Sequence, residues 1–216
     1  MWALAGVPVG AEPGSHPAEL SIDDGQGVQV STLVPLTVVA ADFGTEMINV
    51  PPGRQSLLEA DVILAETERL HRVFGSVTPQ QLWLGLFVWP HQGEITSPYG
   101  MSRTYNGSRS GYHLGIDING DEGAPVVAAN SGRVALADAL QVHGNSVVLD
   151  HGWGLYSLYG HLSEILVQEG QEVTRGDLIG RLGNTGLSTG AHLHWEMRVG
   201  DVAVNPLEWT SRLIPE

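Results

Sequence analysis

The sequence predicts a mainly β protein whose C-terminal half is an antiparallel β-sheet domain. Apolar runs of strand length recur along the chain, and Gly-rich turns separate them. The 216 residues include 28 Gly and 12 Pro, enough to end many short elements. Long runs with helical apolar spacing are few. These observations together favour many short strands.

Residues 1–77 are predicted to be an accessory β-rich region with one helix. Val28–Val30 and Thr37–Ala40 have the composition of strands, and Asp23–Gly25 has that of a turn. The pattern is typical of a small β-sandwich-like domain, and its abrupt start suggests that this domain is incomplete.

The helix of this region is predicted to span about 56–74 and to connect the two parts of the chain. Ser56 and Glu59 fit a capping box, and apolar residues from Leu58 to Val73 recur near helical spacing. Gly75 is the expected C-terminal stop. We assign this helix a packing role and no chemistry.

A connector at 78–92, anchored by Trp83, is predicted to lead into a mainly β domain at 93–212. The Pro residues of the connector disfavour regular structure there. The predicted strands of the second domain lie within Val126–Ala129, Val134–Leu136, Ser146–Leu149, Leu155–Tyr159, Leu178–Ile179 and Leu193–Val199.

Composition excludes several classes of function. The formal net charge is −14 and no Lys is present, so nucleic acid is not an expected partner. No Cys is present, so any metal must bind through His and carboxylates. No apolar run reaches the length of a membrane span, and the N-terminus is a poor signal peptide.

The first motif with chemical content is His113-Leu114-Gly115-Ile116-Asp117. Gly115 and the neighbouring Ile residues disfavour a helix, so a strand is predicted. Even spacing in a strand directs His113 and Asp117 to the same face, and Gly115 leaves space between them. A structural His near an Asp explains this motif equally well.

The second motif is His192-Leu193-His194-Trp195-Glu196. In a strand, His192, His194 and Glu196 share one face, while the intervening apolar residues face the core. Two adjacent imidazoles repel when both are charged, so the pair favours the neutral form that binds metals. A third His, His161, ends an alternating run, and alone it is better read as a surface or core residue.

Combined, the motifs predict a metal site. A catalytic zinc site has three protein ligands and one open position. His113, Asp117 and one His of the 192/194 pair supply two imidazoles and a carboxylate, but spacing does not decide which His binds. The remaining paired His and His161 are then available to move protons or to stabilise an oxyanion.

In this arrangement the sequence resembles the lysostaphin-type (LytM-like, M23) metallopeptidases. The resemblance covers roughly residues 93–208 and rests on three site motifs in the same order. It extends to the surrounding segments Ile95–Gly100, Gly123–Val126, Gly132–Val134, Val148–Gly152, Gly170–Val173, Gly183–Gly186 and Asn205-Pro206.

The resemblance implies zinc ligands at His113, Asp117 and His194, with His161 and His192 as the catalytic histidines. It also implies a narrow groove and the hydrolysis of peptide bonds in bacterial peptidoglycan. The expected location is therefore the cell envelope or the extracellular space, and a monomer is expected. The N-terminal region resembles accessory β-domains that precede such catalytic domains.

Four further residues have alternative interpretations. Arg103 and Tyr105 are candidates for substrate binding, and an ordinary loop role is the alternative. Glu196 either fixes an imidazole from behind or is a plain surface carboxylate. His143 is interpreted as structural.

Three other classes of function compete with the peptidase. A histidine phosphocarrier would explain the segment at His113 but gives no reason for His192 beside His194. A lipoyl or biotinyl carrier would need a Lys, which the chain lacks. A non-catalytic wall-binding or activator relative is disfavoured by the intact ligand set.

Overall fold

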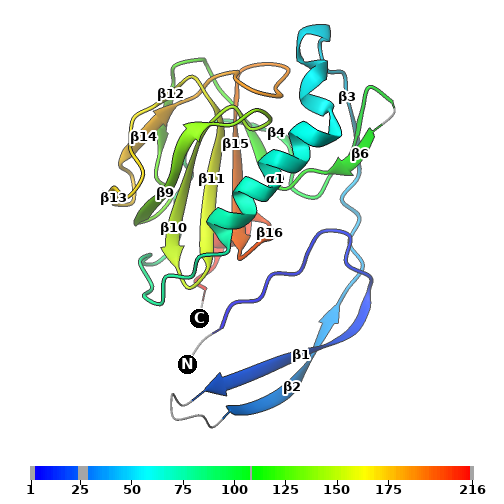
Figure 1. Cartoon of the computed structure of the whole chain (residues 1–216), viewed down its shortest axis with the longest axis vertical. Coiled ribbons are helices and arrows are strands. Elements are labelled where there is room, and N and C mark those ends of the chain that lie inside the picture. The colour runs from blue at the N-terminus through cyan, green and yellow to red at the C-terminus, as the bar shows by residue number, and fades with distance from the viewer. Residues whose placement is uncertain (1–2, 24–28, 108, 215–216) are drawn as a thin grey trace.

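The computed structural model describes residues 3–23, 29–107 and 109–214. Strands dominate, as predicted, and an antiparallel eight-stranded sheet forms the body of the protein (Figure 1). The strands of this sheet lie in the order β13-β9-β10-β11-β15-β7-β4, and β16 pairs with β15. Their bounds are β4 (Ile95–Ser97), β7 (Ile116–Asn119), β9 (Gly132–Ala139), β10 (Asn145–Gly152), β11 (Leu155–Leu162), β13 (Glu172–Val173), β15 (His192–Val199) and β16 (Val202–Val204).

Two small sheets and a short helix flank the body. One sheet has the order β12-β14-β8 and the other β3-β5-β6. The bounds are β3 (Thr45–Ile48), β5 (Ser102–Tyr105), β6 (Arg109–Tyr112), β8 (Pro125–Val127), β12 (Glu164–Ile165), β14 (Leu178–Arg181) and α2 (Pro206–Ser211). Every strand run predicted for the second domain falls wholly or partly within one of these strands.

The N-terminal region differs from the expected sandwich. Its strands β1 (Gly14–Asp23) and β2 (Gln29–Val38) form a hairpin and, within the described ranges, pair only with each other. Asp23 of the predicted turn ends β1, while residues 24–25 of that turn and the first residue of the predicted strand Val28–Val30 lie outside the described residues. Parallel pairing of β3 with β5 joins residues 45–48 to the second predicted domain.

The predicted helix is present, but the predicted capping box at Ser56 is wrong. Residues Pro52–Leu58 form the 3₁₀-helix η1, and helix α1 spans Ala60–Phe74. The residue before α1, Glu59, makes no side-chain capping bond. Pro51 and Pro52 explain the difference, because they start a separate turn ahead of the helix. Gly75 ends the helix as expected.

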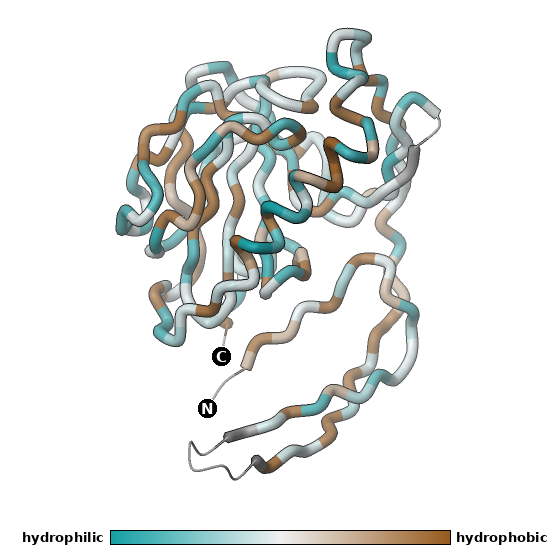
Figure 2. The backbone as a smooth tube through the Cα atoms, in the orientation of Figure 1, coloured by the Kyte–Doolittle hydropathy of each residue, from teal (hydrophilic) through white to brown (hydrophobic). Residues whose placement is uncertain are grey.

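The central sheet is buried on both faces. Residues from alternate positions of β10 and β11, such as Leu149 and Tyr159, join a large core with the connector residue Trp83. The intervening positions, such as Val148 and Leu158, pack against α1 instead. Figure 1 shows α1 crossing the front of the sheet, and in Figure 2 apolar and polar stretches alternate along this helix.

The face that α1 covers is also the face that carries the polar residues of β15. Leu158 lies opposite Glu196, and Gly160 lies opposite His194. The helix therefore covers one part of this face, and its middle turn contacts the histidine His143 through Glu66. Among the described residues, no helix has both the length and the apolar character needed to cross a membrane.

Candidate metal centre

Pairing between β7 and β15 brings two polar side chains together, one strand in from the β4 edge of the sheet. Asp117 lies directly opposite His194, in an antiparallel register that places their side chains on the same face. The intervening residues Leu193 and Trp195 are fully buried in the core. Alternation along β15 thus directs His194 away from the core and onto the face shared with α1.

His113 reaches the same place from a loop and not from a strand. The predicted strand over this motif begins only at Ile116, and residues 113–115 connect β6 to β7. A Cβ atom at Gly115 would lie 2.4 Å from the backbone oxygen of Trp195, so only glycine permits this close crossing. The crossing positions the imidazole of His113 above Asp117.

Three atoms then converge. The Nε2 atom of His113 lies 3.0 Å from Oδ1 of Asp117 and 3.1 Å from Nδ1 of His194. The distance from that Nδ1 atom to Oδ1 of Asp117 is 2.7 Å. These residues form a group whose spacing can hold a metal ion, and all three are buried.

The donor set fits zinc. Two imidazole nitrogens and one carboxylate oxygen are typical ligands of a catalytic zinc site. Tetrahedral ligands with bonds of 2.0–2.1 Å lie about 3.3 Å apart. The three distances here are a few tenths of an ångström shorter, so a small outward movement would accommodate the ion.

Hydrogen bonds on the far side of each imidazole fix which nitrogen faces the cluster. His113 donates from Nδ1 to the backbone oxygen of Pro98 over 2.9 Å. His194 donates from Nε2 to Oε1 of Glu196, also over 2.9 Å. In its neutral form each ring therefore presents an unprotonated nitrogen to the other residues of the cluster. Glu196 is 1% exposed, which supports its role behind an imidazole over the surface reading.

Asp117 is fixed in a similar way by Arg103. The Nη2 atom of Arg103 donates to Oδ2 of Asp117 over 2.5 Å, and its Nε atom donates to Oε2 of Glu46 over 2.9 Å. The Arg103 side chain is only 12% exposed. Its guanidinium is thus directed at a ligand of the cluster. Tyr105, the other predicted substrate contact, lies two residues further along β5 and borders the groove.

His161 and His192 lie together beside the cluster, with ring centroids 4.8 Å apart. Each ring donates from Nδ1 to a backbone oxygen, of Thr185 at 2.8 Å for His161 and of Gly190 at 2.9 Å for His192. The Nε2 atom of His192 lies 3.6 Å from Oδ1 of Asp117. Both rings therefore hold an unprotonated Nε2 available for chemistry at this place.

His161 has an unusual backbone. Its φ of +60° is in the left-handed region, which residues other than glycine rarely adopt. A 2.7 Å bond from its backbone N–H to the backbone oxygen of His143 supports this conformation. Strained backbone of this kind recurs at functional sites, where the surrounding structure maintains it.

Burial and charge set the protonation of the site. Burial lowers the pKa of His113, His161 and His192 below the usual value, so these rings are neutral at pH 7. Burial also opposes charge on His194, but its bonds with Asp117 and Glu196 outweigh that effect and raise its pKa. Neutral imidazoles are the form that binds a metal or accepts a proton.

Three supporting residues of the site escaped the sequence analysis. Glu46 holds Arg103, while Glu66 and His143 form a buried pair behind Glu196. The ring of His143, which the sequence analysis interprets as structural, lies 5.6 Å from that of His194. The sequence contains one sign of a special role for Glu66. This charged residue interrupts the apolar face of the helix, four residues before Leu70.

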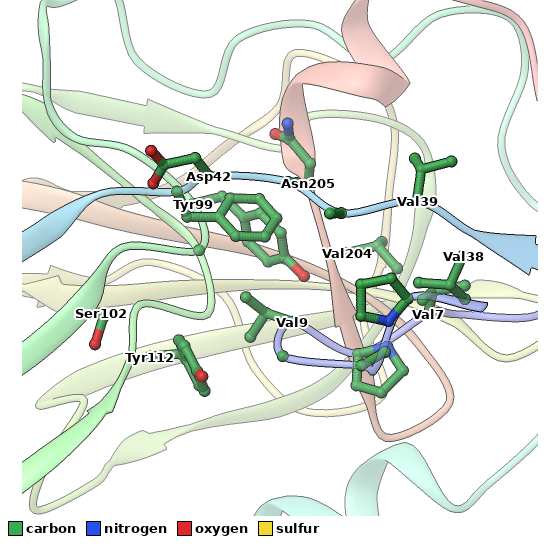
Figure 3. A pocket seen from close by; sticks show the side chains of 18 of the residues that line it. Val7, Val9, Val38, Val39, Asp42, Tyr99, Ser102, Tyr112, Val204 and Asn205 are labelled. Atoms are coloured by element: carbon green, nitrogen blue, oxygen red, sulfur yellow. The ribbon is translucent and has the colours of Figure 1, made fainter.

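A groove of about 520 Å³ opens at the cluster. Its walls come from the cluster itself, from α1 and from the β5–β6 hairpin, and they include His113, His161, His194, Thr67 and Tyr105. A larger hollow, of about 720 Å³, lies elsewhere, between the N-terminal segment and the body near Val9 and Tyr99 (Figure 3). His113, Asp117 and His194 do not line it.

Comparison with known proteins agrees with this geometry. The model of "Peptidase family M23" matches residues 111–206. A curated relative, murein hydrolase activator NlpD of Escherichia coli, is 36% identical over 133 residues, which are 61% of this chain and 32% of that protein. The chain spans about a quarter to a third of the length of such curated relatives.

Two solved structures are also similar. A proposed M23 peptidase from Pseudomonas aeruginosa has a TM-score of 0.72 and 25% identity, covering 96% of this chain and 77% of that chain. A zinc-containing peptidase from Vibrio cholerae has a TM-score of 0.55 and 32% identity, covering 58% of this chain and 40% of that chain.

Proposed function

Because this chain belongs to peptidase family M23 through its residues 111–206, we propose that it is a zinc-dependent endopeptidase. The proposed substrate is the peptide portion of bacterial peptidoglycan, in its cross-links or stem peptides. One observation carries the proposal. Three convergent ligands stand beside two further neutral histidines, and every one of these imidazoles has its outer nitrogen bonded.

In this proposal His113, Asp117 and His194 hold the zinc. Zinc bound there supplies a Lewis acid that polarises a carbonyl group and lowers the pKa of water. Arg103 and Glu196 keep Asp117 and His194 in the orientation that binding requires. The supporting evidence is the donor set, the resemblance of the sequence, and the similarity to a zinc-containing peptidase.

His161 and His192 would perform the proton chemistry of hydrolysis. Each has an unprotonated Nε2, and burial keeps each ring neutral near pH 7. One ring accepts a proton from the attacking water and then donates that proton to the leaving amine nitrogen as the peptide C–N bond breaks. The other ring takes a proton from solvent, donates a hydrogen bond from Nε2 to the oxygen of the attacked carbonyl while negative charge is there, and returns to its neutral form when the products leave.

The peptidoglycan substrate is inferred from the family and from the name of the murein relative. Action on this substrate would place the protein in the cell envelope or outside the cell. The groove beside the cluster has room for an extended peptide, and its α1 wall would contact that peptide. Arg103 and Tyr105 both line the groove and stay the candidate substrate contacts, and Arg103 in addition orients Asp117.

The proposal is tested by digestion of purified peptidoglycan. Wall preparations with different cross-link chemistry are incubated with the zinc-loaded protein, and the released fragments are analysed by mass spectrometry. We expect peptide fragments with new amino and carboxyl ends, and none after treatment with EDTA. Intact cross-links and intact stem peptides in every preparation, from a protein that contains zinc, would contradict the endopeptidase.

A second candidate is a non-catalytic activator of other wall hydrolases. The relative named as a murein hydrolase activator favours it. The same digestion distinguishes the two, if a purified murein hydrolase is added in parallel. An activator would increase the turnover of that hydrolase, and it would do so equally after substitution of His192.

A further inference from the structure

Glu66 is a carboxylate buried in the middle of α1, on the face that otherwise holds Leu70 and Phe74. It is 7% exposed, and a buried charge of this kind is unfavourable unless it is fully hydrogen-bonded. The helix lies outside residues 111–206, where the family model matches. The family match therefore does not explain why the carboxylate of Glu66 is buried beside the proposed metal centre.

All three donors to Glu66 come from the turn between β9 and β10. Oε2 accepts from the backbone N–H of Val142 over 2.6 Å. Oε1 accepts from the backbone N–H of His143 over 3.1 Å and from its Nδ1 over 2.6 Å. The carboxylate thus fixes both the backbone of this turn and the orientation of one ring.

The side chain of His143 leads from Glu66 to a ligand of the cluster. Its Nε2 atom lies 3.5 Å from Oε1 of Glu196, the oxygen that accepts from Nε2 of His194. The other oxygen of Glu196 accepts from Nε of Arg198 over 2.7 Å. The Arg198 guanidinium in turn lies 4.7 Å above the ring of Phe74 on α1. The helix thus supports both oxygens of Glu196.

The backbone of the same turn leads to His161. The oxygen of His143 accepts from the N–H of His161, at the residue that has a φ of +60°. A shift of the turn would remove this bond and relax the backbone of His161. Glu66 is therefore connected to the site by two separate paths, one through side chains and one through the main chain.

We propose that Glu66 is a positioning residue of the metal centre, which holds His194 through His143 and Glu196 and holds His161 through the turn at Val142–His143. This inference rests on the proposed function, since it assigns the cluster a metal. With this role for Glu66, helix α1 contributes to the geometry of the site. The competing reading is that Glu66 only anchors the helix to the sheet.

The test is the zinc affinity of the full chain with Glu66→Gln, measured by competition with a coloured chelator. The amide keeps the shape of the side chain but places an NH₂ group against an N–H donor, so the turn loses at least one bond. We expect zinc binding to weaken about tenfold or more, the range found for partners behind ligands. The absorption spectrum of the cobalt-substituted protein should change as well, because the ligand geometry changes.

Two control variants separate positioning from anchoring. Glu68→Gln removes an exposed carboxylate from the same helix and should leave zinc affinity unchanged. Val73→Ala loosens the packing of the helix against the sheet, and it should lower thermal stability without weakening zinc binding. His143→Gln interrupts the side-chain path beyond Glu66. It should therefore weaken zinc binding in the same direction, and it supplies the test if Glu66→Gln does not fold.

Wild-type zinc affinity and an unchanged cobalt spectrum in a folded Glu66→Gln or His143→Gln protein would overturn the inference. An equal loss of zinc affinity in Val73→Ala would also overturn it, in favour of anchoring. A wild-type protein that binds zinc but releases no peptides contradicts the proposed function alone. The affinity measurement and the digestion therefore fail independently.

Discussion

Nη2 of Arg103 donates a hydrogen bond of 2.5 Å to Oδ2 of Asp117, and this leaves Oδ1 of Asp117 to face His113 and His194. The two oxygens of one carboxylate thus have separate partners. Because the guanidinium is almost fully buried, this pair is little screened by solvent. The orientation of the proposed carboxylate ligand depends on a residue from a different strand.

Substitution of Arg103 by Gln should weaken zinc binding by about 10–100-fold. The amide cannot span from Asp117 to Glu46, so Oδ1 loses its fixed direction and two carboxylates lose their shared cation. Chelator competition measures the affinity. Arg72→Gln, an exposed residue of α1, is the control and should match the wild type. Equal affinities for the Arg103 variant and the control would show that Arg103 does not orient the ligand.

His194→Ala and His192→Ala should separate metal binding from turnover. The first removes one of three mutually adjacent ligand atoms, so zinc affinity should fall by more than about a hundredfold. The second leaves the three ligands in place and should keep zinc while peptide release falls about 10²–10⁴-fold. Zinc content by atomic absorption and fragment release by mass spectrometry are the two readouts. Loss of zinc in His192→Ala, with zinc kept in His194→Ala, would show that His192 binds the metal and His194 does not.

The metal-free protein should become less stable between about pH 6.5 and pH 9. The pKa of His143 is raised to about 9, because its bonds with Glu196 and Glu66 outweigh the burial that opposes its charge. A folded-state pKa above the unfolded value gives a stabilisation that is full below about pH 6.5 and is lost as the pH rises through 9. The loss should amount to at most about 3 kcal/mol.

Urea unfolding in EDTA, at about pH 6 and about pH 9.5, measures this dependence through the free energy of unfolding. In His143→Gln the difference between the two pH values should shrink, since the variant has no proton to lose there. If His143→Gln kept the full pH dependence of the wild type, groups other than His143 would be its cause.

Gly115→Ala should both destabilise the protein and disturb the cluster. Its Cβ atom would lie 2.4 Å from the backbone oxygen of Trp195 and 2.9 Å from Cγ of Glu196, so the loop that carries His113 must move. The expected cost is about 1–3 kcal/mol in the free energy of unfolding. Gly111→Ala is the matched control, because its Cβ atom would meet nothing within 4 Å. If the two substitutions cost the same, close packing at Gly115 is unimportant.

The residues of the cluster could be picked out from the sequence because they lie in short local motifs. The spacing of His192, His194 and Glu196 follows from the period of a strand, and β15 has that alternation. Spacing alone did not choose between His192 and His194. In the structure His194, and not His192, lies opposite Asp117. This register joins residues 77 positions apart along the chain, so local spacing does not reveal it.

The support behind the ligands was not predictable in the same way. Glu46 and Glu66 act on residues 57 and 77 positions away, and no local pattern links them to the motifs. The loop conformation of His113 was also missed, because strand propensity does not include the close crossing beneath Gly115. In the N-terminal region, alternating apolar residues indicated strands correctly but said nothing of how many layers they form.

The long-range contacts of the upstream residues have a consequence for protein engineering. A truncated gene product that began at residue 93 would retain all three clustered ligands and both neighbouring histidines. It would lack Glu46 behind Arg103, Glu66 behind His143, and Arg54, whose guanidinium donates to the side-chain and backbone oxygens of Asn184 in the loop before His192. A shortened protein should therefore not begin where the sequence similarity begins. A design that transfers this centre to another scaffold would also have to include Glu46, Arg54 and Glu66.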